Sequence, residues 1–259
     1  MRVTNIAIGS GIITALLSII SGGAVSAART PIVHAEVRTE PLMKLPPLER
    51  AALTALESHG PLPLLAPTLV PYATRALVQA SATGYTIEWY TSMANQAIPK
   101  LAMYSTKPFY NWPIAGAADL GGWDYQWFRT AAEANHIMVK NNAFRLTGVP
   151  VKLVNGVTAH MNMKTGIVAW IQGGWHLSAQ DGNIPTRAAM LALANGLVKS
   201  LKGPFPKATH PGYVSVFTGG ISFGTGVTWQ VGNQVLDVGS TGDPNTILAE
   251  ARSVTRARL

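Results

Sequence analysis

The chain has 259 residues and no cysteine, and its 20 lysines and arginines against 12 acidic residues give a net charge of +8. The lack of cysteine excludes disulfides, thiolate metal sites, thiol nucleophiles and cysteine-linked lipids. The basic residues are scattered and do not cluster with aromatic residues, which argues against nucleic acid as a partner. The length allows one large domain or two small ones.

Residues 1–27 have the pattern of a secretory signal peptide. Arg2 is followed by an apolar run from Ile6 to Ile20, and Val25-Ser26-Ala27 fits the small-x-small pattern of a cleavage site. A second such pattern ends at Ala35. An uncleaved anchor is the alternative, but the apolar run is shorter than the ~20 residues of a spanning helix. We therefore expect a secreted or extracytoplasmic protein with no membrane span after cleavage.

The segment 28–60 is predicted to be a tether that ends in a short helix. Leu48 to His59 places apolar residues on one side of a helix, and Gly60-Pro61 stops it. The following stretch, 61–71, contains four prolines, which are unsuited to helix interiors and central strands. We expect this stretch to lie extended on a single exported domain, 61–259.

The first half of this domain offers strands and one ambiguous segment. Gly84–Tyr90 and Leu101–Thr106 are predicted strands because they are rich in β-branched, aromatic and apolar residues. Tyr125–Thr130 also fits a strand. Ala131–Lys140 fits a helix and a strand equally well.

A spacing of 59 residues relates two parts of the C-terminal half. Without a gap it connects identical residues at six positions: Val168 and Val227, Trp170 and Trp229, Gly173 and Gly232, Leu177 and Leu236, Pro185 and Pro244, and Ala192 and Ala251. Each copy has the pattern of a β-hairpin, because Gly173-Gly174 and Gly232-Asn233 can supply the positive φ of a two-residue turn. One more strand precedes each hairpin, at 149–159 and 213–217. The predicted repeats are 149–202 and 208–258.

A helix is expected to close each repeat. The first, 185–202, has Asn183 as its expected N-cap and ends before Gly203-Pro204. The second begins at Pro244 after the N-cap Asp243 and is expected to run to about Ala257. The elements together predict an α+β fold, a curved antiparallel sheet with helices packed on one face and two hairpin-then-helix repeats.

Three stretches of the chain resemble uncharacterised exported proteins of Gram-positive bacteria. They are Leu65-Ala-Pro-Thr-Leu-Val-Pro71, the strand that begins Gly84-Tyr-Thr, and the closing Val227-Thr-Trp-Gln-Val-Gly-Asn with Ile247-Leu-Ala-Glu-Ala-Arg-Ser-Val254. The closing stretch resembles a domain of unknown function whose sheet-plus-helix organisation is similar to lipoprotein-carrier and sigma-regulator folds. The resemblance covers about 61–259 and implies a fold and a compartment. It supplies no catalytic residues.

Aromatic residues between positions 109 and 128 form the candidate ligand-binding site. The candidates are Tyr110, Trp112, Trp123, Tyr125 and Trp127, because rings bury apolar ligands or stack on sugars. Asp119 and Asp124 in the same region are the candidate carboxylates of a glycoside hydrolase, which needs two of them beside the scissile bond. The simpler interpretation is a loop that packs its own aromatic rings over the edge of the sheet.

Other motifs give little chemistry. The serines near glycines, Ser222 and Ser240, lie in turn-like contexts, so we expect no nucleophilic serine. The glycine-rich 219–226 lacks the Gly-Lys-Ser/Thr ending of a phosphate loop, so we expect no cofactor. His160 and His176 alternate with apolar neighbours along their strands. They are the one candidate metal or acid–base pair, and two solvent-facing histidines are the alternative.

The sequence favours a non-catalytic binding or sensing domain at the cell envelope, with a cell-wall polymer or an apolar molecule as ligand. A secreted hydrolase of wall polysaccharide and a structural component of a surface coat are the alternatives. The charge has two interpretations. Loss of Arg2 with the signal leaves 19 basic against 12 acidic residues, a net +7 that attracts an anionic wall. Equally, a scarcity of carboxylates limits acid denaturation.

Overall fold

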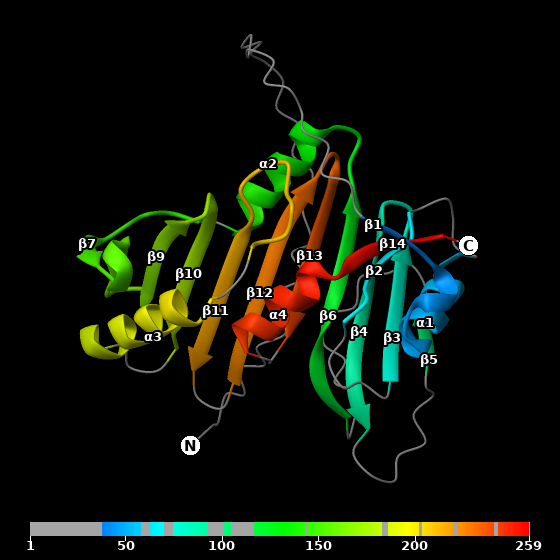
Figure 1. The fold of residues 1–259 in the computed structure, drawn as a ribbon, viewed down its shortest axis with the longest axis horizontal. Helices are drawn as coiled ribbons and strands as arrows, with labels where there is room; N and C mark the ends of the chain where they lie inside the picture. The colour runs from blue at the N-terminus through cyan, green and yellow to red at the C-terminus, as the bar shows by residue number, and fades with distance from the viewer. Residues whose placement is uncertain are drawn as a thin grey trace, which may run out of the picture.

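The computed structural model describes residues 38–57, 63–69, 75–92, 101–104, 117–142, 144–182, 186–201, 204–219, 222–240 and 243–258. These residues form a mixed α+β fold in which four α-helices accompany one large, mostly antiparallel sheet (Figure 1). None of the described helices has the length and apolar character needed to cross a membrane. The predicted α+β class and the large antiparallel sheet are confirmed.

The large sheet contains eleven strands in the spatial order β5, β3, β4, β6, β13, β12, β11, β10, β9, β8, β7. Their bounds are β3 (Arg75–Ser81), β4 (Gly84–Ser92), β5 (Leu101–Tyr104), β6 (Ala117–Trp127), β7 (Val149–Lys152), β8 (Thr158–Asn162), β9 (Ile167–Gln172), β10 (Trp175–Asp181), β11 (Tyr213–Gly219), β12 (Ser222–Val231) and β13 (Gln234–Ser240). Two neighbouring pairs are parallel, β3 with β5 and β10 with β11. The sheet is open, with β5 and β7 at its edges.

Two hairpins of the sheet have the same cross-strand pairing. Trp170 on β9 pairs with Leu177 on β10, and Trp229 on β12 pairs with Leu236 on β13. The first hairpin turns through Gly173-Gly174, and both glycines have a positive φ, as a type I′ turn requires. Each hairpin buries its Trp–Leu pair in the main core.

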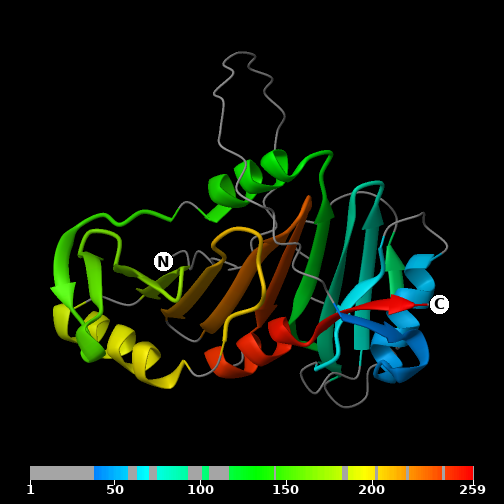
Figure 2. The ribbon, with the colours of Figure 1, turned by 45° about the horizontal axis from the view of Figure 1, so that its top comes forward.

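Three helices cover one face of the sheet and one helix covers the other (Figure 2). On the first face lie α1 (Pro47–Glu57), α3 (Arg187–Ser200) and α4 (Pro244–Arg252), and on the opposite face lies α2 (Ala131–Asn142). The expectation that the helices pack on one face is therefore wrong for α2. The physical reason is a second, smaller apolar patch on the far face, where Tyr213 and Val235 are buried against α2.

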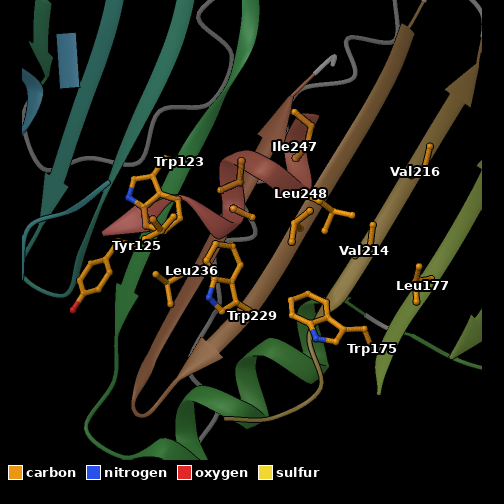
Figure 3. Close-up of a cluster of buried hydrophobic side chains, with 14 of the residues drawn as sticks. Trp123, Tyr125, Trp175, Leu177, Val214, Val216, Trp229, Leu236, Ile247 and Leu248 are labelled. Carbon is orange, nitrogen blue, oxygen red and sulfur yellow. The ribbon is translucent and has the colours of Figure 1, made fainter. Parts of the chain in front are cut away.

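The main core lies between the sheet and the three helices of the first face. A row of cross-strand neighbours runs through it from β4 to β9, and each of its side chains is at most 2% exposed: Ile87, Trp123, Val238, Val227, Val214, Leu177 and Trp170. Ile247 and Leu248 of α4 are buried in the same cluster (Figure 3). Alternation along the strands therefore turns the intervening residues of these strands toward the other face.

The N-terminal part of the described chain belongs to the fold. A second sheet has the order β1-β14-β2, where β1 is Arg38–Pro41, β14 is Val254–Arg258 and β2 is Leu65–Pro67. A short 3-10 helix, η1 (Leu42–Lys44), connects β1 to α1, whose Leu53 and Leu56 are buried in the core. Residues 38–57, assigned to a tether and short helix, are thus packed against the domain.

The ends of several elements differ from the expectation. Asp243 caps α4 as predicted, but α4 ends at Arg252 and the chain continues as β14. Thr186 caps α3 by accepting from the backbone N–H of Ala189, whereas Asn183 lies outside the described residues. The single strand expected at 149–159 is divided by η2 (Val154–Gly156), where Asn155 has a positive φ.

Candidate functional site

The five predicted ligand-binding aromatic residues do not form one surface in the described chain. Trp123 and Tyr125 are 0% exposed on the helix-covered face. The Trp123 Nε1 donates to the carbonyl oxygen of Leu65 at 2.9 Å, and Tyr125 stacks on Tyr85. Trp127, at the end of β6, is 38% exposed. The last two, Tyr110 and Trp112, lie outside the described residues. Two of the five rings therefore serve the core.

Asp119 and Asp124, the predicted catalytic carboxylates, both lie on β6. Five residues of strand span about 16 Å, whereas glycoside hydrolases hold their two carboxyl groups roughly 5 to 9.5 Å apart. In the backbone register, Asp119 pairs with Tyr90 and Asp124 pairs with Thr86 and Asp237. The acidic neighbour of Asp124 is therefore Asp237.

Asp124 and Asp237 form a carboxyl pair between two threonines. They are directly opposite on the antiparallel strands β6 and β13, a position that places Cβ atoms about 4.5–5.5 Å apart. Thr86 on β4 donates its hydroxyl to Asp124 Oδ1, and Thr228 on β12 donates to Asp237 Oδ2. We call the line Thr86, Asp124, Asp237 and Thr228 the carboxyl row. It crosses four adjacent strands on the face opposite α1, α3 and α4.

The environment of the pair favours its protonated form. Burial, with a smaller contribution from the charge of Asp237, raises the pKa of Asp124 to about 7. Burial also raises the pKa of Asp237 to about 6. Hydrogen bonds from Thr86 and Thr228 favour the charged forms and oppose this effect only in part. In mildly acidic solution the pair therefore holds a proton and offers both a donor and acceptors.

Residues with small side chains lie beside the carboxyl row, two positions farther along β6, β13 and β12, and continue onto β11 and β10. They are cross-strand neighbours from β6 to β10: Gly122, Gly239, Gly226, Ser215 and Ser178. We call them the small-residue strip. Ser215 is exposed and the other four are partly exposed. A Cβ atom built on Gly239 would have its nearest neighbour at 4.0 Å, so the described chain leaves the backbone uncovered there.

Helix α2 borders the carboxyl row on its other side. Ala134 and Met138 of α2 are buried in one cluster with Tyr213 and Val235. Gln230, on β12, fixes the helix start by donating from Nε2 to the carbonyl oxygen of Ala131 at 2.8 Å. The carboxyl row therefore lies between a small apolar cluster and the uncovered small-residue strip.

The two predicted histidines lie on this same face but at different levels. The register aligns His176 with Tyr213, whereas His160 is aligned with Ala169 and Ser178. The ring of His176 stacks on Phe144 with 4.4 Å between ring centroids, and burial lowers the pKa of His176. Within the described ranges no three His, Cys, Asp or Glu side chains form a group suited to a metal ion. The histidines thus do not assemble the proposed metal site.

Comparison with known proteins identifies no relative: neither a family model, nor a curated protein, nor a solved structure matches the chain. The function must therefore be inferred from the site itself. Asp237, Thr86 and Thr228 were not among the residues predicted from the sequence. Alternation along Gln234–Ser240 places Asp237 on the strand face opposite to Leu236 and Val238. The pairing of β13 with β6, more than 100 residues earlier, has no local signal.

Proposed function

We propose that this chain is an exported, non-catalytic binding or sensing domain of the cell envelope, and that it binds a hydroxyl-rich cell-wall glycan. The observation that carries the proposal is the Asp124–Asp237 pair beside the small-residue strip. A carboxyl pair that holds a proton donates one hydrogen bond and accepts several, which matches vicinal hydroxyl groups. The strip lets a flat sugar ring approach the backbone.

The packing of the sheet face covered by α1, α3 and α4 favours a glycan over an apolar ligand. The row from Ile87 to Trp170 is buried under α3 and α4 and their neighbouring elements. An apolar ligand on that face would have to displace side chains that already fill the core. The face of the carboxyl row instead presents polar and partly exposed residues. A net positive charge adds a long-range, salt-dependent attraction to an anionic wall.

The proposal is tested by co-sedimentation of the mature protein with purified cell-wall material at pH 5.5, in low and high salt. Binding should persist in high salt and fall at least tenfold in the double variant D124A/D237A, which removes the donor and the acceptors of the pair. The matched control is E57A/E133A, which removes two carboxyl groups at exposed positions and should bind like the unaltered chain. Equal binding by both double variants, or binding that vanishes in high salt, would overturn the proposal.

A second candidate function is hydrolysis of the same glycan. The observation that favours it is again the neighbouring pair, because two carboxyl groups with different protonation are the acid and nucleophile or base of glycosidases. Release of reducing ends from wall material measures this activity. Turnover by the unaltered chain that D237N abolishes would replace the binding proposal with an enzymatic one. We expect no turnover from either protein.

A further inference from the structure

A second pair of acidic residues lies in the main core, away from the carboxyl row. Glu49, in the first turn of α1, is 0% exposed, and Glu250 of α4 is 3% exposed. Their helices are separate in sequence but both contact β2. The charge of Glu49 acts on Glu250 strongly enough to raise the pKa of Glu250. The two carboxyl groups therefore share one buried region.

The carboxyl group of Glu49 has no compensation for its burial. Neither Oε1 nor Oε2 has a hydrogen-bond partner in the described chain. Burial raises the pKa of Glu49 to about 7, and burial together with the Glu49 charge raises that of Glu250 to about 8. A buried, uncompensated carboxylate costs several kcal/mol. Burial therefore makes both glutamates favour their neutral forms in the packed structure.

The surrounding elements supply little opposite charge. On this side of the sheet the described titratable and charged side chains of the elements near α1 and α4 are Tyr85 of β4, Tyr125 of β6, Glu40 of β1, Lys44 of η1, Arg50 and Glu57 of α1, Arg252 of α4 and Arg256 of β14; β2 carries none, and the side chain of Arg75 on β3 lies outside the described ones. Lys44 pairs with Glu40, Arg50 reaches the carbonyl oxygen of Met43, and Arg252 reaches that of Pro204. Arg256 is exposed. Because neither carboxyl oxygen of Glu49 has a partner among these groups, no ion pair compensates the ionised form of Glu49.

We propose that α1 is an acid-dependent latch: it packs on β2, β3 and β5 while Glu49 and Glu250 are protonated, and it detaches from these strands when the glutamates ionise. The large sheet, which carries the carboxyl row, stays folded. Detachment hydrates both carboxylates at the cost of the contacts made by Leu53 and Leu56 of α1. The latch makes the packing of the N-terminal region respond to the pH outside the membrane, and it does not depend on the proposed ligand.

The test is hydrogen–deuterium exchange of the full mature chain at pH 5.5 and pH 8.5, corrected for the intrinsic pH dependence of exchange. Each unit by which packing raises a pKa makes the opening of α1 about ten times more favourable once that group is ionised. The open population of α1 should therefore be at least about tenfold higher at pH 8.5 than at pH 5.5. Peptides from α1, 47–57, should lose protection, while peptides from β9 and β10, 167–181, should not.

Three variants make the result decisive. E49Q/E250Q, which cannot ionise, should keep α1 protected at both pH values, and E49Q alone should reduce the change if the double variant folds poorly. E57Q, at an exposed position of the same helix, should behave like the unaltered chain. Protection of α1 that is equal at both pH values, or a pH effect that persists in E49Q/E250Q, contradicts the latch. A uniform loss of protection across all peptides also contradicts the latch, since such a loss indicates global unfolding.

Discussion

Asp124 and Asp237 lie directly opposite each other on neighbouring antiparallel strands, and each accepts a hydrogen bond from a threonine on the next strand outward. Like charges at such positions destabilise a sheet. The arrangement is stable when the pair is protonated, and the raised pKa values of both groups express this preference. Together with Glu49 and Glu250, four of the 12 acidic residues of the chain favour their neutral forms when folded.

The first prediction is that the protein is more stable in mild acid than at alkaline pH. The four carboxyl groups have folded-state pKa values of about 6 to 8, above the unfolded values near 4. The folded state therefore binds more protons, and its stability is full below about pH 4 and is lost as pH rises through 6 to 8. Thermal unfolding should show a Tm at least ~5 °C higher at pH 4.5 than at pH 8.5. A Tm that is equal at the two pH values, or higher at pH 8.5 than at pH 4.5, would contradict the prediction.

The second prediction concerns the hydroxyl group that supports Asp237. Thr228→Val keeps the shape of the side chain but removes the donor, so the unfolding free energy should fall by about 1–2 kcal/mol. The loss should be larger at pH 8 than at pH 5, because the hydrogen bond favours the charged carboxylate. Urea unfolding at the two pH values measures it. As a control, Thr158→Val, at an exposed position of β8, should change stability little; an equal effect of both variants would speak against a supporting role for Thr228.

The third prediction is that two glycines on neighbouring strands, Gly121 and Gly239, respond differently to substitution. Gly121 has a φ of +124°, and a Cβ there would lie 2.0 Å from the carbonyl oxygen of Gly239, so Gly121→Ala should destabilise the fold by at least ~3 kcal/mol. Gly239→Val should fold with a smaller loss because the nearest atom to its Cβ, the carbonyl oxygen of Thr225, lies 4.0 Å away. It should nevertheless weaken wall binding, since the branched side chain covers the small-residue strip. Unchanged binding by a folded Gly239→Val protein would exclude the strip from the site.

Local chemistry made part of this fold predictable. The turns Gly173-Gly174 and Gly232-Asn233, the Asp243-Pro244 start of α4 and the alternation of β4 are signals carried by a few adjacent residues. They require no knowledge of distant partners.

The site could not be predicted because it depends on distant pairing. Trp123 and Asp124 are adjacent in sequence, yet one is buried under the helices and the other joins Asp237 on the opposite face. An aromatic stretch looks alike whether its rings face a ligand or the core. Only the register of β6 against β13 decides between the two. Likewise, the placement of α2 depends on a patch formed by Tyr213 and Val235, which come from two different strands.

Glycan binding at the carboxyl row and the small-residue strip is tested most directly by an NMR titration. The isotope-labelled protein is titrated with solubilised cell-wall glycan fragments at pH 5.5. If the glycan binds at the carboxyl row, the largest changes in amide chemical shift should occur at Gly122, Gly226 and Gly239 and at the neighbouring Asp124 and Asp237. The amides of α3 should change little. The D124A/D237A variant, which lacks the donor and the acceptors, should lose these shifts while keeping the remainder of its spectrum. Shifts confined to other surfaces, or none at millimolar fragment, would contradict the assignment of this face as the binding site.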